Sequence, residues 1–434
     1  MVAGSVLGEK VLRKEDPKFL TTGGVYLDDF DDPRLEGAVH VVFARSPIAH
    51  GTINSIDTAE AASMPGVVAV YTAADLSLQP TPSAFNPAVA RTLLASGKVR
   101  WVGEPLAAVL AETYEQATDA AQTIYADIDP LPALIDIEQA LASDLLIYED
   151  AGSNAVFDST ALGGSPNSGP EYFEGCEVVV TERVINQRVA PCPLESRAGA
   201  AVWHDDRLLV WISTQHAQGA LAPIAGVCGV DTSKVRIMTP DVGGGFGAKI
   251  GCYSEELLLG LLSQHCGRPV RFKETRSESM MNLGHGRAQL QKITVGGNRD
   301  GKVTHLRLEL YQDSGGYAEI GTVLGALFTR GMAAAVYDIP NVEAHCTSVV
   351  TNTTPIVAYR GAGRPEATAA AERAMDLFAR EVGLDAVEVR RRNLLPKFDE
   401  PHTTASGTAY DCGDYERCLD LALDAADYTA LRAE

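Results

Sequence analysis

The chain lacks the closely spaced cysteine and histidine pairs with which proteins hold a metal ion or an iron–sulfur cluster. Its eight cysteines are scattered, and the closest two, Cys412 and Cys418, do not have the short gap of such ligand pairs. Its nine histidines form no His-x-x-x-His array. We therefore expect mostly buried thiols and no metal held by protein ligands alone, so any metal has to arrive bound to another group.

The chain also has little positive charge and no long apolar run. It carries 36 Lys and Arg against 57 Asp and Glu, a formal net charge of −21. This charge opposes attraction to phosphate backbones and anionic lipid, so nucleic-acid binding is not expected. No stretch reaches membrane-spanning length, and residues 1–10 mix charges without the apolar run of a leader. The sequence predicts a cytoplasmic protein with no membrane span.

What is present is enough apolar sequence for more than one domain, since 46% of the 434 residues are hydrophobic. Apolar runs and helical composition predict three strands and a helix, at 37–44, 66–71, 106–111 and 114–124. These elements indicate a small α+β domain. The stretch 161–170, dense in Gly, Pro and Ser, is typical of a linker. We therefore expect one domain with an N-terminal arm at 1–160, a linker at 161–175 and a second domain at 176–434.

The second part of the chain has clear local signals. Ser254 is expected to cap a helix at 255–266, and Gly267 to end it. Pro365 and Gly383 bound a second helix between them. The other predicted elements are paired strands at 200–213, a helix at 221–227, a strand at 235–238, a short helix at 388–395 and a hairpin of 288–295 with 302–312.

The segment Asp241-Val242-Gly243-Gly244-Gly245-Phe246-Gly247-Ala248-Lys249 is a site candidate, because four glycines let a ligand approach backbone amides closely. A dinucleotide-binding reading, and with it an NAD-dependent dehydrogenase, fails because the next helix begins only near Ser254. A phosphate loop fails because Ile250 replaces the required Ser or Thr. A flexible glycine-rich turn remains the alternative.

Two arginine clusters are further candidates. Arg360 and Arg364 lie on a glycine-rich turn before a predicted helix, where guanidinium groups and backbone donors can hold an anionic or oxo ligand. The alternative is a helix-entry turn whose arginines pair with surface carboxylates. The run 390–392 is more typical of a solvated helix face.

Several motifs occur together in a particular order. They are Arg13-Lys14-Glu15-Asp16, Thr22-Gly23, Ser46-Pro47-Ile48-Ala49-His50, Val102-Gly103-Glu104-Pro105, Ser213-Thr214-Gln215, Gly243-Gly244-Gly245-Phe246-Gly247, Ala358-Tyr359-Arg360-Gly361 and Val389-Arg390-Arg391-Arg392-Asn393. With them the chain resembles the molybdopterin-binding (large) subunits of the xanthine dehydrogenase, aldehyde oxidase and aerobic carbon monoxide dehydrogenase family. The resemblance covers nearly the whole chain.

This resemblance implies an α+β fold with a hammerhead α/β domain followed by the first molybdopterin-binding domain. It implies that Gln215 lies beside a molybdenum oxo group and that Arg360 stabilises negative charge on the substrate. The cofactor contacts that it implies are Gln215, Gly245, Phe246, Gly247, Arg360 and Arg390. No protein side chain is expected to ligate the metal directly.

The resemblance also implies a function: oxidation of a C–H bond in an aldehyde or N-heterocycle, with water as the oxygen source. The cofactor would be molybdenum-molybdopterin in a dinucleotide form, with iron–sulfur clusters and FAD on partner subunits. Two residues depart from relatives. Gly361 stands where carbon monoxide dehydrogenases have a copper-binding cysteine, and Ile250 where purine-oxidising relatives have a glutamate. Both departures favour a substrate other than carbon monoxide or a purine, although a carbon monoxide dehydrogenase-like subunit stays an alternative.

Length is the largest departure. Single-chain relatives continue through a second molybdopterin-binding domain with a Gly-Glu-Gly segment, whose glutamate acts as the base. This chain stops at Glu434, and Gly103-Glu104-Pro105 belongs to the N-terminal domain. We therefore expect a split-gene subunit that works with a second molybdopterin-binding chain. A truncated product and a noncatalytic cofactor-binding or assembly partner are the alternatives.

Overall fold

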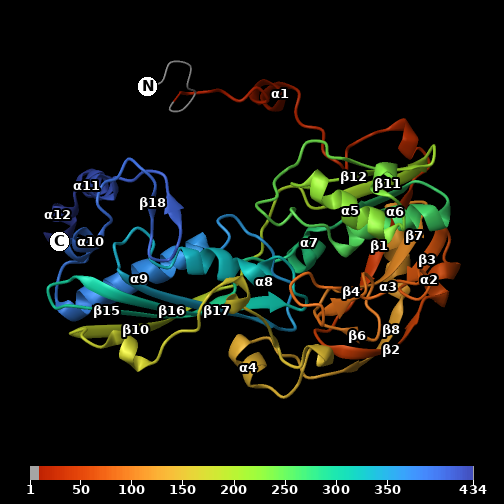
Figure 1. Cartoon of the computed structure of the whole chain (residues 1–434). Coiled ribbons are helices and arrows are strands. Elements are labelled where there is room, and N and C mark those ends of the chain that lie inside the picture. Colours follow the sequence, from red (N-terminus) through yellow and green to blue (C-terminus); the bar gives the residue numbers. More distant parts are fainter. Residues whose placement is uncertain (1–8, 434) are drawn as a thin grey trace.

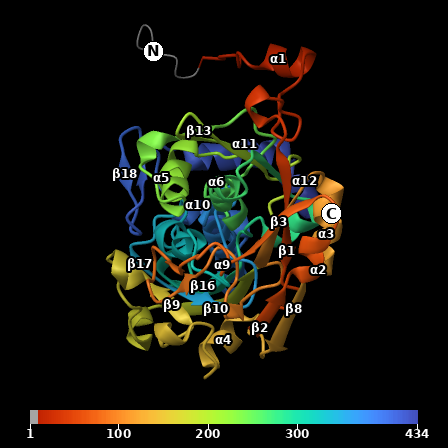
Figure 2. The same cartoon turned by 90° about the vertical axis from the view of Figure 1, so that its right-hand side faces the viewer.

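The structure is a computed structural model of the whole chain, and the residues that it describes are 9–433. It is elongated, with one lobe built around a seven-stranded sheet and the other around a five-stranded sheet (Figure 1). The N-terminal arm with α1 (Asp16–Thr21) projects from one edge of the body in both views, and Lys18 of α1 pairs with Asp241 of the body (Figures 1 and 2). The C-terminal helices lie at the far end of the five-stranded lobe (Figure 1).

The seven-stranded sheet mixes early and late parts of the chain. Its order is β13 (Val235–Met238), β12 (Arg207–Ile212), β11 (Ala198–His204), β14 (Val270–Lys273), β1 (Val39–Arg45), β7 (Pro105–Ala111) and β3 (Val67–Thr72). β1 pairs parallel with β14 and antiparallel with β7, which is buried along its whole length. Strands from both sides of the predicted linker therefore share one core.

Helices cover this sheet and extend its core. α6 (Ser254–Cys266) buries Leu258, Leu259 and Leu262 in the same cluster as Val41 and Phe43. The other helices of this lobe are α2 (Ala59–Ser63), α3 (Tyr114–Thr123), α5 (Ala217–Val227) and α7 (Arg276–Asn282). A small sheet of β6 (Lys98–Val99), β2 (Gly51–Asp57) and β8 (Tyr125–Pro130) adjoins them.

The second lobe is organised by long strands. Its sheet has the order β10 (Val178–Asn186), β15 (Gln289–Gly297), β16 (Val303–Gly315), β17 (Asn341–Val350) and β9 (Ala155–Asp158). α9 (Arg364–Val382) packs Met375 and Phe378 into the core formed with this sheet. The shorter helices are α4 (Ile137–Ala142), α8 (Gly321–Leu324), α10 (Ala386–Asn393), α11 (Tyr415–Ala425) and α12 (Tyr428–Ala433).

The predicted α+β class is confirmed, and most predicted elements are present within a few residues of their expected bounds. The expected hairpin of β15 and β16 forms, with Gly301 at φ +92° in its turn. One detail was wrong: Ser254 is not the cap of α6 but its first residue. Glu256 accepts the backbone N–H of Tyr253 at 3.0 Å instead, and the Ser254 hydroxyl accepts from Arg91 Nη1 at 2.8 Å.

The domain boundary at 161–175 stays a prediction. This stretch contains parts of two short 3₁₀ helices, Ser159–Leu162 and Pro170–Phe173. β9, which precedes it, pairs antiparallel with β17 of the second lobe. The chain therefore already contributes to the second lobe before residue 161.

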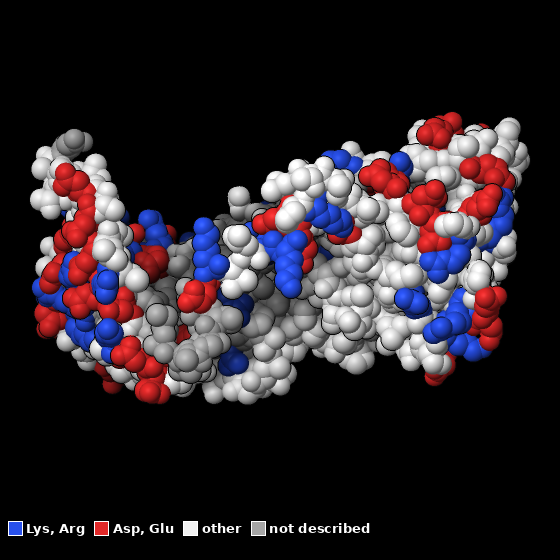
Figure 3. All heavy atoms as spheres, turned by 90° about the horizontal axis from the view of Figure 1, so that it is seen from above, with Lys and Arg blue, Asp and Glu red and all other residues white. Residues whose placement is uncertain are grey.

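No helix within residues 9–433 combines the length and the apolar character needed to cross a membrane. On the face seen in Figure 3, blue basic side chains are interspersed with red acidic ones at both ends of the molecule. That face has no continuous basic stripe of the kind that follows a nucleic-acid backbone.

A buried ionic network ties β11, α6 and β14 together. The Arg197 side chain is 0% exposed and binds Glu274 at 2.7 Å and Glu255 at 3.1 Å. Arg45 of β1 adds a second cation, 2.7 Å from Glu255. Burial alone would raise the pKa of Glu255, but the charges of Arg197 and Arg45 outweigh it and hold that pKa well below its usual range. The network is stable only while its charges stay matched.

Removal of Glu274 should therefore destabilise the seven-stranded lobe. Glu274→Ala leaves Arg197 buried with one carboxylate fewer, which we expect to lower the free energy of unfolding by about 3 kcal/mol or more. The matched control is Glu309→Ala, whose pair with Lys292 at 3.2 Å is solvent-exposed and should contribute about 0–1 kcal/mol. Urea unfolding measures both variants. Equal midpoint shifts would contradict the assignment of this network as a stabilising centre.

Candidate functional site

The glycine-rich segment forms a strained loop between β13 and α6. Gly244 and Gly247 have φ values of +101° and +100°, and Phe246 between them has φ +53°. A positive φ is unfavourable for a bulky residue and persists only where surrounding contacts enforce it. Such strain gathers at functional sites, so the loop remains the leading candidate.

Two of these glycines are required by close contacts. A Cβ on Gly247 would lie 2.7 Å from the carbonyl oxygen of Ala358. A Cβ on Gly245 would lie 2.3 Å from Gln215 Oε1. Glycine therefore allows three separate chain segments to meet at this loop.

Hydrogen bonds hold these segments in place. The backbone N–H of Gly247 donates to Gln215 Oε1 at 2.8 Å, and the Gln215 N–H donates to the Lys249 carbonyl at 2.8 Å. The Arg360 N–H donates to the Phe246 carbonyl at 2.8 Å. Five of the six residues expected to contact the cofactor are thus brought together, at Gln215, Gly245, Phe246, Gly247 and Arg360.

The side chains at this loop keep polar groups available for a ligand. Gln215 accepts with its amide oxygen, and its amide N–H groups have no acceptor within residues 9–433. The exposed Arg360 guanidinium has no hydrogen bond or ion pair in the same part of the chain. Arg364 instead donates to the Gly361 carbonyl at 3.2 Å and stacks over Phe328. Neither arginine pairs with a described carboxylate, which disfavours the surface ion-pair alternative.

Contacts that the sequence did not reveal support the loop on its buried side. Lys249 is 1% exposed, and its ammonium group donates to the Glu195 carbonyl oxygen and carboxylate, each at 2.9 Å. The same carboxylate accepts from the Gly243 N–H at 2.8 Å. The Tyr253 hydroxyl donates to the Ala248 carbonyl at 2.6 Å. Glu195 lies far from the loop in sequence, and no local pattern links the two.

The sixth predicted residue, Arg390, lies elsewhere. It belongs to α10 and pairs with Glu372 at 2.7 Å and Asp376 at 2.8 Å. Figure 1 shows α10 at the end of the molecule opposite α5, which follows Gln215. No contact links Arg390 to the loop in the described residues, and its role in cofactor binding stays a prediction.

Backbone irregularity also surrounds the Arg360 turn. Ala362 has φ +45°, and the neighbouring segment Gly325–Thr329 is a π-helix. A Cβ on Gly363 would lie 2.8 Å from the backbone nitrogen of Thr329, so the turn and the π-helix are in close contact. Single π-turns occur frequently at functional sites. The described residues contain no group of three or more His, Cys, Asp or Glu able to hold a metal ion.

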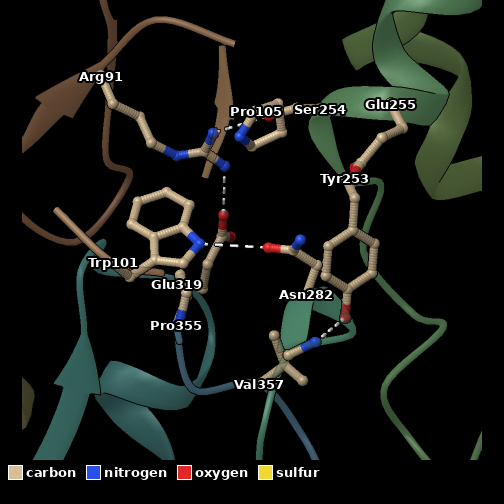
Figure 4. Close-up of a pocket in the computed structure, with 11 residues that line it drawn as sticks. Arg91, Trp101, Pro105, Tyr253, Ser254, Glu255, Asn282, Glu319, Pro355 and Val357 are labelled. Atoms are coloured by element: carbon tan, nitrogen blue, oxygen red, sulfur yellow. Dashed lines mark hydrogen bonds and ion pairs between the residues drawn. The ribbon is translucent and has the colours of Figure 1, made fainter. Parts of the chain in front are cut away.

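A small cavity marks the junction of the two lobes (Figure 4). Its volume of 30 Å³ suits about one water molecule. Arg91 donates to Ser254 at 2.8 Å and lies 3.4 Å from Glu319, while its Nε is buried without a partner. Trp101 donates to Asn282 at 3.3 Å beside the same cavity. This cavity therefore serves lobe packing rather than binding of a substrate-sized molecule.

Comparison with known proteins identifies this arrangement. Residues 147–394 match the family model of the molybdopterin cofactor-binding domain. Residues 21–132 match that of the aldehyde oxidase and xanthine dehydrogenase a/b hammerhead domain. The chain belongs to the xanthine dehydrogenase and aldehyde oxidase family of molybdopterin-binding subunits. The resemblance and the expected order of the two domains are confirmed.

Relatives include both longer chains and one of similar extent. The chain is 33% identical to the nicotine 6-hydroxylase large subunit of Paenarthrobacter nicotinovorans, over 99% of this chain and 53% of that protein. It is 32% identical to the quinoline 2-oxidoreductase structure from Pseudomonas putida 86, with a TM-score of 0.89 over 98% of this chain and 54% of the other. It is 27% identical to the nicotinate dehydrogenase large molybdopterin subunit of Eubacterium barkeri, over 89% of each. The chain thus spans about half the length of the first two.

The loop residues fit a molybdopterin group. Glycines leave space that a Cβ would fill, and the Gln215 amide and the Arg360 guanidinium keep free donors beside it. Free donors suit the oxo and phosphoryl oxygens of such a cofactor.

The loop's geometry predicts different effects of two neighbouring glycine substitutions. Gly247→Ala places a Cβ 2.7 Å from the Ala358 carbonyl at φ +100°, so it should distort the loop at a cost of about 1–3 kcal/mol. We expect loss of bound pterin with the secondary structure retained. Gly251→Ala is the matched control, because its Cβ would meet nothing within 4 Å. Pterin fluorescence after denaturation measures retention, and equal retention in both variants would contradict the close-packed loop.

Proposed function

We propose that this chain is the cofactor-binding front part of a molybdenum hydroxylase that oxidises a C–H bond with oxygen from water. The main support is that Gln215, the loop 245–247 and Arg360 lie together, and that each keeps hydrogen-bond donors available for a ligand. When bound, the cofactor supplies the redox and oxygen-transfer chemistry. The chain's own residues position it and shape the electrostatic field around it.

Each residue has a distinct task in this proposal. The Gln215 amide N–H groups would help to hold the cofactor, while the amide oxygen accepts from the Gly247 N–H at 2.8 Å, which fixes the orientation of the side chain. The Arg360 guanidinium stabilises negative charge that develops on the substrate. Because the Arg360 backbone is bound to the Phe246 carbonyl, both donors are set by one loop. Lys249 and Glu195 hold that loop closed from the buried side.

The substrate that fits best is an aldehyde or an N-heterocycle. Gly361 offers no thiolate for copper, which disfavours carbon monoxide as the substrate. Ile250 is 40% exposed and apolar, so the polar partner expected for a purine is replaced by an apolar surface. Relatives named for nicotine and quinoline, both N-heterocycles, support this substrate class.

We further propose that catalysis requires a second molybdopterin-binding half, on the same polypeptide or on a partner chain. The relatives that are about twice as long support this view, and the nicotinate dehydrogenase subunit, matched over 89% of its length, supports a separate chain. That half would carry the base. Iron–sulfur and FAD subunits would accept the electrons, the pterin would be a dinucleotide form, and the complex would work in the cytoplasm.

The proposal predicts that the assembled native protein contains molybdenum and pterin in equal amounts. The physical reason is that the free donors of the loop, and the space left by its glycines, suit one molybdopterin group. Metal analysis by plasma mass spectrometry and pterin fluorescence measure the two contents. An active assembled protein with neither component would end the proposal.

Loss of the Arg360 guanidinium should slow turnover without release of the cofactor. Arg360→Ala removes a charge from the site while leaving its backbone bond to Phe246 intact. We expect kcat to fall about 10²–10³-fold, as for the loss of one transition-state donor, with unchanged molybdenum content. Arg299→Ala, on the turn between β15 and β16, is the control and should keep full activity. An unchanged rate in Arg360→Ala would reduce Arg360 to a structural residue.

A further inference from the structure

A second polar pocket lies on the five-stranded lobe, apart from the loop. Its volume is 310 Å³, near the lower end of small-molecule sites. We call it the serine–glycine pocket. Its principal lining residues are Gly163, Gly164, Ser165, Arg330, Glu343 and Ser406. None of the five residues gathered at the loop lines it.

Arg330 supplies positive charge to this pocket. Its Nε donates to the Ala326 carbonyl at 2.9 Å, which fixes the start of the guanidinium. Its Nη1 and Nη2 have no hydrogen-bond or ion-pair partner within residues 9–433, and neither is a buried orphan. Two charged donor groups therefore remain available to a ligand. Arg307 of the same lobe is by contrast held by the Glu343 carboxylate and the Gly169 carbonyl.

The opposite wall leaves room for the guanidinium. A Cβ on Gly164 would lie 2.8 Å from Arg330 Nη1, so a larger residue there would push the guanidinium aside. Gly163 has φ +74°, and the chain turns sharply there to form this wall of the pocket. The Ser165 hydroxyl makes no hydrogen bond to described residues and lies on the same wall. The wall thus combines a close approach of the chain to the guanidinium with a hydroxyl that can donate to an anion.

Acidic residues nearby are already neutralised. Glu343 lines the pocket, but it accepts from Arg307 Nε at 2.9 Å and from the Ser168 backbone N–H at 3.2 Å. Asp158 binds His345 at 2.9 Å. Arg330 is therefore the one charged lining residue without a partner of opposite charge among the described residues. The local charge favours an anion although the whole chain carries −21.

From this geometry we propose that the serine–glycine pocket binds the phosphoryl group of a small metabolite, separately from the molybdopterin site. A phosphoryl group offers several acceptor oxygens to the two free guanidinium nitrogens and the Ser165 hydroxyl. The pocket's size admits a phosphate with a small organic part. The source is either free inorganic phosphate or a phosphorylated organic molecule, and the chemistry recognised is the same.

Isothermal titration calorimetry of the assembled protein with pyrophosphate and with AMP tests this proposal. We expect both to bind, and tighter binding of AMP would indicate a phosphorylated organic ligand. Arg330→Gln should weaken binding at least about tenfold, because charge-assisted hydrogen bonds are lost. Gly164→Ala should also weaken it, although it keeps the charge, because it displaces Nη1. Arg299→Gln is the control for net charge and should bind as the parent protein does.

Three outcomes would overturn the proposal. The parent protein does not bind either compound, or Arg330→Gln leaves binding unchanged. The third is loss of molybdenum and pterin in Arg330→Gln, since the pocket would then belong to the cofactor site. Because cofactor content is measured in every variant, a failure of the hydroxylase proposal is seen independently of pyrophosphate binding.

Discussion

Strand β14 is the element on which the placement of the helical end of the glycine-rich loop depends. It pairs parallel with β1 of the N-terminal region and antiparallel with β11, so it joins early and late chain segments in one sheet. Beyond its last residue, Glu274 binds the fully buried Arg197, which precedes β11. Glu255 at the start of α6 completes the network. The loop between β13 and α6 is thus anchored at its helical end by matched buried charges.

This anchorage explains how a strained loop persists. Phe246 in the loop and Ala362 in the Arg360 turn both have positive φ, and the Arg360 N–H joins the two segments by its bond to the Phe246 carbonyl. Backbone strain of this kind costs of order 1–3 kcal/mol per residue and has to be offset by rigid surroundings. Buried Lys249, with its two bonds to Glu195, and the Tyr253 hydroxyl provide them. The loop is therefore preorganised, as a site that holds a ligand requires.

Local signals explain what the sequence could predict. The apolar run of β7, the turn at Gly301 and the helix bounded by Pro365 and Gly383 each depend on neighbours in sequence, and all are present. The glycine loop was recognisable because glycine itself carries the signal. The contribution of Glu195 to the loop could not be predicted, because its partner Lys249 lies 54 positions away in the sequence. The capping role predicted for Ser254 was wrong because the sequence does not show two contacts. The Ser254 hydroxyl accepts from Arg91, and Glu256 accepts from the Tyr253 N–H at the start of the helix.

The arginines illustrate why long-range pairing decides function. In sequence, Arg360 lies on a glycine-rich turn, Arg390 in a run of three arginines and Arg330 beside Gly331, and none of these patterns shows which guanidinium finds a partner. In the fold, Arg390 is held by two carboxylates, whereas the guanidinium nitrogens Nη1 and Nη2 of Arg330, and the whole guanidinium of Arg360, remain free in the described chain. A guanidinium already bound to carboxylates has little capacity left for an anionic ligand, since its donors are used. The unpaired guanidinium groups on which both proposals rest are therefore set by the tertiary structure and not by local sequence.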